Sequence, residues 1–250
     1  MVDNGLYILI KEKVKRNQKI FSVLIDPDKQ NFAELLKTIH RCNESNIDFF
    51  LVGGSIITQV ELDKTVHAIK ENSKIPVILF PGNHSHISGK ADGILFLSLI
   101  SGKNPDFLIG NQLLATPTIR KTKLEVIPTG YLLVDCGKAT TVLKVSETTP
   151  IDYHDDDVAE TTALTGQLLG QKLIYIDGGS GAEKAISNNM IQRVKNSLNI
   201  PLIIGGGIRS AATAELVYKS GADIIVVGNG VEKNRSLISE IASLKTRLNG

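Results

Sequence analysis

The sequence predicts a single α/β domain folded as a (β/α)8 TIM barrel, with its active site at the carboxyl ends of the strands. Eight short β-branched apolar runs recur along the chain, and stretches with helical spacing of apolar residues lie between most of them. The length of 250 residues suits one such barrel. Because no Pro-, Gly- or Ser-rich linker interrupts the chain, we expect one domain over residues 1–250. A doubly wound sheet fits less well, since it normally uses fewer consecutive strands and its dinucleotide-binding glycine motif is missing.

The eight runs are too short for globular helices and are apolar on both faces, as buried parallel strands are. They cover residues 21–26, 48–54, 76–82, 92–98, 131–135, 172–179, 201–207 and 223–230. Apolar residues at three and four spacing predict helices between them, for example over 32–39, 186–194 and 238–248. Segment 99–130 predicts a helix and a short strand with poorly marked boundaries. The polar, Thr-rich segment 136–153 predicts a long loop.

The composition excludes several classes of protein. Twenty-eight basic and 26 acidic residues leave a formal charge of +2, which is too small for a nucleic-acid-binding surface. The two cysteines, Cys42 and Cys136, cannot form a disulfide framework or a zinc ligand set, and they favour a reducing, cytoplasmic location. No apolar run approaches the roughly 20 residues of a membrane-spanning helix, although peripheral contact with a membrane surface is compatible with the composition.

Glycine-rich turns follow each of the last three predicted strands. These turns are Gly178-Gly179-Ser180-Gly181, Gly205-Gly206-Gly207 and Gly228-Asn229-Gly230. Glycine lets the backbone turn sharply and approach a ligand closely, so that N–H groups can bind an anion. A single cluster would indicate only a tight turn. Three clusters at the corner where barrels commonly bind phosphate predict a phosphate site.

Two aspartates, Asp26 and Asp28, follow the first predicted strand in the stretch LIDPDK. A carboxylate at a strand end can bind Mg²⁺, which prefers oxygen ligands, and Ser55 after the second strand can add a hydroxyl oxygen. Stabilisation of a turn explains Asp26 equally well. Asp28 is alternatively the cap of the helix that begins near Asn31.

Asp177 ends the sixth predicted strand, directly before the first glycine-rich turn. A carboxylate there can act as general base on a hydroxyl of a phosphorylated ligand, or can accept a hydrogen bond and only orient that hydroxyl. Tyr175 lies two residues earlier on the same side of the strand and can add a hydroxyl contact.

Other polar residues have simpler explanations. The run Asp155-Asp156-Asp157 precedes a helical pattern, and an acidic first turn explains it better than a magnesium motif does. His84 and His86 lack a third metal ligand and are kept only as candidate diphosphate contacts. Cys136 has no base near it in the sequence, which argues against a nucleophilic role.

Seven stretches of the chain form an ordered set: FSVLIDPDK, LVGGSIIT, ILFPGN, IPTGYLLVD, YIDGGSGA, LIIGGGIRS and ADIIVVGNG. Together they resemble the geranylgeranylglyceryl phosphate synthase and heptaprenylglyceryl phosphate synthase family, in the family's order, from about residue 20 to residue 235. The chain is most similar to the branch with the longer GGSGA motif.

The resemblance implies a Mg²⁺-dependent prenyltransferase with a TIM barrel. Its substrates would be a polyprenyl diphosphate, with geranylgeranyl as the expected chain, and sn-glycerol 1-phosphate. Transfer to the sn-3 hydroxyl would form the first ether bond of archaeal-type lipids and release diphosphate. By position, Asp26 and Ser55 match the family's magnesium ligands, and Asp177 occupies the position of the base. The implied glycerol-phosphate site comprises Tyr175, Ile176, Asp177, Gly178, Gly179, Ser180, Gly181, Gly206, Gly207, Gly228 and Asn229.

The chain departs from the family at two positions. The family usually has glutamate where this chain has Asp177, so the carboxylate is retracted by about one methylene. Some members have lysine two residues before the first aspartate, where this chain has Leu24. Phosphate binding would then depend on backbone amides, with Lys29 or Arg209 as the candidate cations.

A long prenyl tail requires an apolar groove. Phe80, Phe96, Leu97 and Tyr131 are candidates for its walls, although an ordinary barrel core explains each of them equally well. Two other functions stay open at this point. A barrel enzyme acting on a small sugar phosphate would keep the glycine turns but would need no apolar channel leading from Asp26. A non-catalytic barrel that binds phosphoglycerol or a prenyl lipid would show no turnover.

Assembly is the last expectation. Members of the family are dimers or larger rings, so the resemblance implies a homo-oligomer, either a dimer or a hexamer. The apolar helix face expected within 104–119 is the candidate interface.

Overall fold

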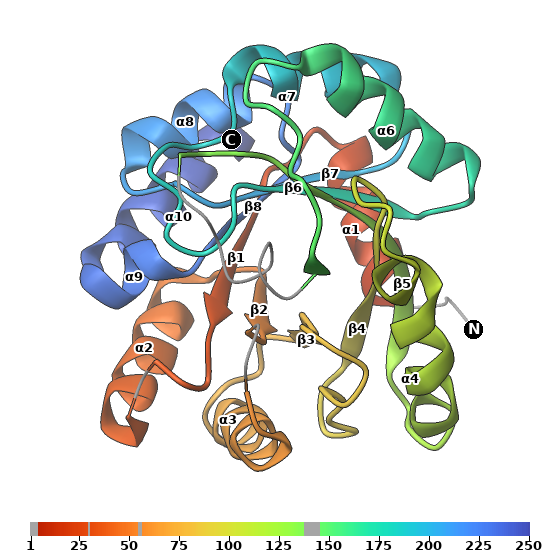
Figure 1. Ribbon diagram of the computed structural model, residues 1–250. Coiled ribbons are helices and arrows are strands. Elements are labelled where there is room, and N and C mark those ends of the chain that lie inside the picture. Colours follow the sequence, from red (N-terminus) through yellow and green to blue (C-terminus); the bar gives the residue numbers. More distant parts are fainter. Residues whose placement is uncertain (1–4, 30, 55–56, 138–145) are drawn as a thin grey trace.

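The computed structural model describes residues 5–29, 31–54, 57–137 and 146–250. Within these ranges, eight parallel strands close into a barrel in which each strand pairs with its neighbours in sequence and β8 pairs with β1 (Figure 1). The predicted (β/α)8 barrel is confirmed. The strands are β1 (Ile20–Ile25), β2 (Phe49–Val52), β3 (Val77–Leu79), β4 (Gly93–Leu99), β5 (Glu125–Leu133), β6 (Leu173–Asp177), β7 (Leu202–Gly205) and β8 (Ile224–Val227).

Helices surround the barrel on its outer side (Figure 1). After β1 and β2 come α2 (Phe32–Ser45) and α3 (Gln59–Asn72), and after β4 come a π-helical turn η1 (Asp106–Gly110) and α4 (Asn111–Ile119). The later helices are α6 (Asp156–Leu168), α7 (Asn188–Ser197), α8 (Ala211–Lys219), α9 (Asn229–Lys233) and α10 (Ser236–Asn249). The connection between β3 and β4, residues 80–92, contains no helix. This break in the alternation leaves room for a cavity beside β4.

The apolar side chains form two layers because strand residues alternate between the two faces of the sheet. In β6, Leu173 and Tyr175 point into the barrel, whereas Ile174 and Ile176 pack against the surrounding helices. A helix at the start of the chain, α1 (Leu6–Lys15), closes one end of the barrel. Its Ile10 is 2% exposed and belongs to the interior layer. The carboxyl ends of the strands form the opposite, open end.

Helix capping follows the sequence prediction at α6 and corrects it at α2. Asp155 accepts a hydrogen bond from the backbone N–H of Val158 at 3.0 Å, which confirms the acidic first turn of α6. α2 is capped by the side chain of Asn31, which accepts from the N–H of Glu34 at 3.0 Å. The alternative in which Asp28 caps this helix is therefore wrong.

The poorly marked segment 99–130 contains η1, α4 and the first half of β5. The fifth strand starts at Glu125 rather than at residue 131, because Pro128 and Gly130 lie within it instead of ending it. A Cβ at Gly130 would lie 2.8 Å from Ile100 Cδ1 and 2.9 Å from Ile174 Cδ1, so the ends of these two side chains pack closely over the glycine. Within the described ranges, no helix is long and apolar enough to cross a membrane.

Candidate active site

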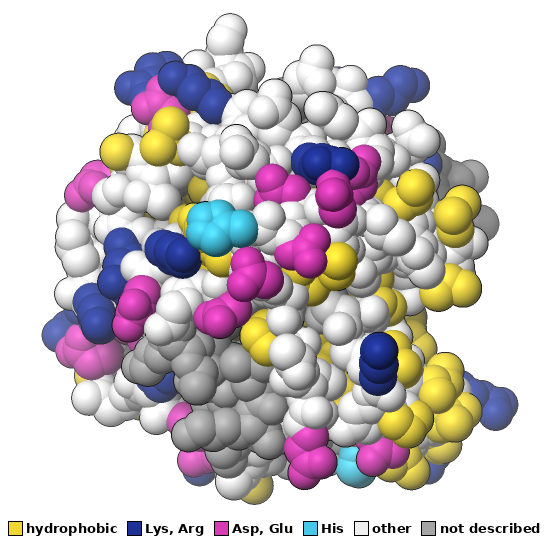
Figure 2. Space-filling model, turned by 45° about the horizontal axis from the view of Figure 1, so that its top comes forward, with side chains coloured by type: hydrophobic (Ala, Val, Ile, Leu, Met, Phe, Trp, Pro, Cys, Tyr) yellow, Lys and Arg dark blue, Asp and Glu magenta, His cyan; other side chains and the backbone are white. Residues whose placement is uncertain are grey.

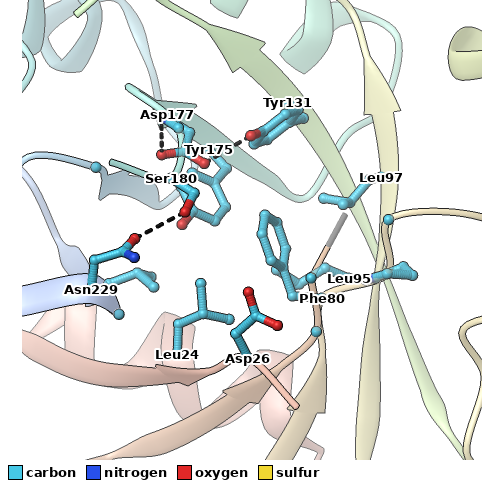
Figure 3. Close-up of a pocket in the computed structure, with 18 of the residues that line it drawn as sticks. Leu24, Asp26, Phe80, Leu95, Leu97, Tyr131, Tyr175, Asp177, Ser180 and Asn229 are labelled. Atoms are coloured by element: carbon cyan, nitrogen blue, oxygen red, sulfur yellow. Dashed lines mark hydrogen bonds between the residues drawn. The ribbon is translucent and has the colours of Figure 1, made fainter. Parts of the chain in front are cut away.

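A cavity of about 880 Å³ opens at the carboxyl ends of the strands. In Figure 3, the polar side chains of Asp177, Ser180 and Asn229 gather on one side of the cavity, and the apolar side chains of β4 lie on the other. Asp26, which follows β1, lies below Phe80 in this view. The polar wall includes Asp26, Lys29, Asp177, Ser180, Arg209, Asn229 and Glu232. The apolar wall includes Leu24, Phe80, Ile94, Leu95, Phe96, Leu97, Leu99, Phe107 and Ala115.

The turns after β6, β7 and β8 form one wall of the cavity and meet there as predicted. Gly206 and Gly207 have φ angles of +80° and +69°, which other residues adopt only with strain. A Cβ at Gly206 would lie 2.7 Å from the backbone nitrogen of Gly178. The backbone N–H groups of Ser180, Gly181, Gly206 and Gly207 have no hydrogen-bond acceptor among the described residues. Such a set of donors suits a phosphate group.

Asp177 lies at the boundary between the glycine-rich turns and the barrel interior, 7% exposed. Its Oδ2 accepts a hydrogen bond from the hydroxyl of Tyr131 at 2.8 Å, and its Oδ1 accepts one from the N–H of Gly179 at 2.8 Å. Burial raises the pKa of Asp177, and these two hydrogen bonds counteract part of that rise. A carboxylate with a raised pKa beside a phosphate site has the properties of a general base.

Three aromatic rings cover the floor of the cavity below Asp177. Phe80 stacks on Tyr175 with 5.3 Å between ring centroids, and Tyr131 packs edge-on against both rings. Burial raises the pKa of both tyrosines well above the ordinary value, so both hydroxyls remain protonated donors. Glycine is needed at position 205 because a Cβ there would collide with the hydroxyl of Tyr175.

The predicted magnesium site is described on one side only. The Asp26 carboxylate faces the cavity and forms an ion pair with Lys29, with 2.8 Å between Oδ2 and Nζ. Ser55, the second predicted ligand, lies outside the described residues. Within the described ranges, no group of three His, Cys, Asp or Glu side chains is arranged to hold a metal. One carboxylate still fits Mg²⁺, which is commonly held by one or two carboxylates together with substrate phosphates.

The apolar part of the cavity is continuous with the Asp26 side. All four predicted groove candidates, Phe80, Phe96, Leu97 and Tyr131, line the cavity. Further walls come from η1 and α4, including Phe107 and Ala115. The sequence predicts an apolar helix face within 104–119 only as an interface between subunits, and not as a wall of the groove. The cavity thus joins an anion site to an apolar channel that leads from Asp26. A small sugar phosphate would not require that channel.

The chain matches the PcrB family over residues 12–245. It belongs to the PcrB family. It is 47% identical over 239 residues to a geranylgeranylglyceryl phosphate synthase of Chitinophaga pinensis, covering 96% of this chain and 95% of that protein. A synthase of the same name from Pyrococcus horikoshii is 43% identical over 242 residues, covering 96% and 94%.

One solved structure that is similar to this PcrB-family chain contains a ligand. It is the (S)-3-O-geranylgeranylglyceryl phosphate synthase of Thermoplasma acidophilum in complex with sn-glycerol-1-phosphate. The TM-score is 0.90 at 34% sequence identity, and the alignment covers 96% of this chain and 97% of that one. The resemblance that the motifs predicted is confirmed.

Not every predicted site residue of this PcrB-family barrel presents a side chain to the cavity. The side chain of Ile176 packs in the outer layer and does not line the cavity. The N–H of Gly178 is already bound to the carbonyl of Gly205. His84 lines the cavity, whereas His86 is buried, with its Nδ1 3.2 Å from the N–H of Gly82. The position of His86 indicates a structural role in the loop after β3.

Tyr131 is the functional residue whose role the sequence reasoning missed. We assigned it to the tail groove, but its hydroxyl also bonds the candidate base. The sequence did contain a signal for this contact, namely the alternation of side chains between the two faces of a strand. Residues 131 and 177 both occupy inward-facing positions on adjacent strands. Cys136 is buried, and burial raises the pKa of its thiol to about 12 although the charge of Lys184 counteracts part of that rise, in keeping with an unreactive residue.

Proposed function

We propose that this chain is a prenyltransferase that joins a geranylgeranyl group to sn-glycerol 1-phosphate. The observation that carries the proposal is the continuity of the cavity, in which phosphate-binding turns, a buried carboxylate and an apolar channel share one space. Relatives named geranylgeranylglyceryl phosphate synthase support the same reaction.

In this proposal, the free N–H groups of the turns after β6 and β7, together with the turn after β8, hold the phosphate and direct the glycerol hydroxyl towards Asp177. Tyr175 supplies a second hydroxyl contact from the floor of the cavity. The glycerol oxygen forms a bond to C1 of the prenyl chain while the bond from C1 to diphosphate breaks. Asp177 takes the hydroxyl proton, and diphosphate leaves. Fixing both substrates in this geometry can lower the barrier by several kcal/mol, on the order of 7–11 at the limit.

The shorter carboxylate of Asp177 is compatible with this role because of where it is held. Both of its oxygens are fixed, by Tyr131 and by the N–H of Gly179, and both donors favour the ionised form. Each oxygen retains a lone pair that can accept a proton from a hydroxyl bound over the glycine turns. The position is therefore set by the protein rather than by the length of the side chain.

Magnesium is proposed as the cofactor, held by Asp26 and Ser55 with the diphosphate oxygens. When bound there, it would neutralise the charge of the departing diphosphate. Asp26 faces the same cavity as Phe80 and Leu97, so the diphosphate would lie between the glycerol-phosphate site and the apolar channel. The prenyl tail would then extend past Phe80 towards Phe107 and Ala115.

A turnover assay tests the proposal. Purified protein is given geranylgeranyl diphosphate, sn-glycerol 1-phosphate and Mg²⁺, and lipid product is measured after organic extraction. We expect product from the unmodified protein and losses of about 10²–10⁴-fold in Asp177→Asn, the range for removal of a general base. We also expect little product from Asp26→Asn or without Mg²⁺. A folded protein that forms no product with this or longer prenyl diphosphates contradicts the proposal and favours a binding protein.

We also propose that the protein is a homo-oligomer, a dimer or a hexamer. On η1 and α4, Ile109, Leu113 and Leu114 are 56%, 67% and 62% exposed. Hydrophobic side chains gather at the lower right of Figure 2, the side on which Figure 1 places α4. Size-exclusion chromatography with light scattering tests this interface, because Leu113→Glu should lower the assembled mass. An unchanged mass contradicts the choice of α4.

A cytoplasmic location with peripheral membrane contact is the last part of the proposal. Cys42 and Cys136 are free and buried, as expected in a reducing compartment. Phe32 and Val60 are 64% and 61% exposed at the starts of α2 and α3, on the open side of the barrel. Co-sedimentation with anionic vesicles tests the contact, and Phe32→Ser with Val60→Ser should reduce it.

A further inference from the structure

Lys29 connects the two polar sites of the cavity. It follows β1, and its ammonium group lies 2.8 Å from Oδ2 of Asp26 and 3.1 Å from Oγ of Ser180. Ser180 belongs to the turn after β6, 151 residues further along the chain. One cation therefore contacts both the candidate metal ligand and the candidate phosphate loop.

The hydrogen bonds continue from Lys29 into the β8 turn. Oγ of Ser180 donates to Oδ1 of Asn229 at 3.0 Å (Figure 3). Nδ2 of Asn229 in turn donates to Oε2 of Glu232 at 3.2 Å. The charges of Lys29 and Asp26 also act on Glu232, whose pKa is raised chiefly by burial. The network thus spans from β1 to the β6 and β8 turns, along the wall where a phosphate would bind.

The other cations around the cavity are placed differently. The guanidinium of Arg209 is bound to the carbonyl of Ala182, and Lys233 is exposed near the end of α9. Leu24, which also lines the cavity from β1, contributes no charge there. Lys29 is consequently the cation that β1 provides next to the glycine-rich turns.

The ion pair between Lys29 and Asp26 can be broken readily, so that another cation can replace Lys29. The side chains are 36% and 16% exposed, and partly exposed ion pairs of this kind contribute little to stability. A divalent cation bound to the Asp26 carboxylate would repel the ammonium group of Lys29 and replace it as the partner of that carboxylate. The flexible lysine stem already places Nζ at Ser180, so a phosphate held by the β6 turn is within its reach.

We propose that Lys29 is a positioning residue that pairs with Asp26 when no metal is bound and transfers to the glycerol phosphate when a divalent cation binds Asp26. The inference rests on the proposed function. Binding of magnesium with diphosphate then strengthens binding of glycerol phosphate, and by linkage the reverse holds to the same extent. The consequence is that the glycerol substrate is held most tightly when the second substrate is in place.

Calorimetric titration of sn-glycerol 1-phosphate, with and without Mg²⁺ and pyrophosphate at matched ionic strength, tests this coupling. For the unmodified protein we expect Mg²⁺ with pyrophosphate to tighten the Kd by about 5–150-fold, the usual range of coupling between sites. In Lys29→Gln, glycerol phosphate should bind weakly under both conditions. In Asp26→Asn, Lys29 is already released, so binding should be tight without Mg²⁺ and should not respond to it.

Steady-state kinetics provide a second readout and a matched control. Lys29→Gln should raise the KM for glycerol phosphate more than it lowers kcat, since the residue binds substrate and takes no part in bond breaking. Lys37→Gln removes the same charge from α2 at a residue paired with Glu34 and outside the cavity, and it should behave as the unmodified protein.

The outcomes separate this inference from the proposed function. Turnover together with full coupling in Lys29→Gln overturns the role of Lys29 and leaves the prenyltransferase intact. Coupling that survives in Asp26→Asn also overturns it. An unmodified protein that neither binds glycerol phosphate nor forms product overturns both.

Discussion

The hydroxyl of Tyr131 donates a 2.8 Å hydrogen bond to Oδ2 of Asp177, and both side chains are buried. The register of β5 and β6 produces this contact, because Tyr131 is paired with Tyr175 and Asp177 lies two residues further along β6. The contact holds the candidate base in one orientation and favours its ionised form. Tyr131 is therefore a candidate member of the catalytic arrangement as well as a part of the cavity wall.

The Tyr131→Phe variant should shift the pH dependence of the reaction. Removing the hydroxyl removes a hydrogen bond that lowers the pKa of Asp177, so that pKa rises. The base must be ionised, and activity is lost as pH falls through its pKa. The acid limb of the kcat/KM profile should therefore move upwards by roughly one to two pH units, because a hydrogen bond to a charged group contributes about 1.5–3 kcal/mol.

Tyr218→Phe is the matched control for this shift. The hydroxyl of Tyr218 is equally buried and donates to the carbonyl of Ile20 at 2.8 Å, away from the cavity. Its loss should lower stability without moving the pH profile. An acid limb that stays in place in Tyr131→Phe would show that the tyrosine does not act through Asp177.

Gly206→Ala should weaken binding of glycerol phosphate. The φ of +80° costs a side chain about 1–2 kcal/mol, and the new Cβ would lie 2.7 Å from the nitrogen of Gly178 and 2.9 Å from Oδ1 of Asp177. The turn must shift, and we expect a loss of at least about tenfold in affinity, equivalent to about 1.4 kcal/mol. Calorimetry with sn-glycerol 1-phosphate measures the change.

Gly170→Ala separates strain from damage to the site. Gly170 has a φ of +90°, but a Cβ there would meet nothing within 4 Å. This variant should lose the same roughly 1–2 kcal/mol of stability that a side chain at positive φ costs, about 2–8 °C in Tm, and should keep its affinity for glycerol phosphate. Equal affinities in the two variants would argue against a phosphate at the β7 turn.

Ala115→Phe should shorten the prenyl chain that the enzyme accepts. Ala115 is on α4, is 6% exposed and lines the apolar end of the cavity. A phenyl ring there removes space from the cavity, on the wall along which the prenyl tail is proposed to lie. The kcat/KM for geranylgeranyl diphosphate should fall well below that for geranyl diphosphate, and the shorter substrate is the internal control. A parallel fall for both substrates would indicate that overpacking has disturbed the fold instead.

Alkylation should leave the native enzyme active. Burial raises the pKa of Cys136 to about 12, so at about pH 8 only roughly one molecule in ten thousand carries the thiolate. Cys42 is buried as well. Iodoacetamide should modify neither cysteine in the folded protein and both after denaturation, as read by mass spectrometry. Rapid inactivation of the native protein would show that the site around Cys136 opens in solution.

Local patterns in the sequence were enough to predict the barrel and much of its polar rim. A strand that is buried on both faces must be apolar at every position, and a turn after it must be rich in glycine when the backbone approaches a ligand. Segments 172–181 and 201–207 carry both signals within about ten residues. Asp177 could be predicted for the same reason, because its place at a strand end depends only on its own neighbours in the chain.

The β3–β4 connection and segment 99–130 mark where that reasoning fails. Pro128 and Gly130 are typical turn residues, yet both lie inside β5, where the side chains of Ile100 and Ile174 pack closely over Gly130. The apolar channel exists because residues 80–92 form no helix and because α4 packs beside β4. The sequence pattern within segment 80–92 or within segment 99–130 does not show that the two segments border the same cavity.

The sequence by itself determined the identity and order of the strands, the glycine-rich turns and the carboxylates at the strand ends. Only the tertiary structure decided which of these side chains touch. The Tyr131–Asp177 bond depends on strand register, and the Lys29–Ser180 bond joins residues 151 positions apart. Both arise because closing the barrel brings the ends of all the strands to one rim, a constraint that acts on the whole chain and leaves no local pattern.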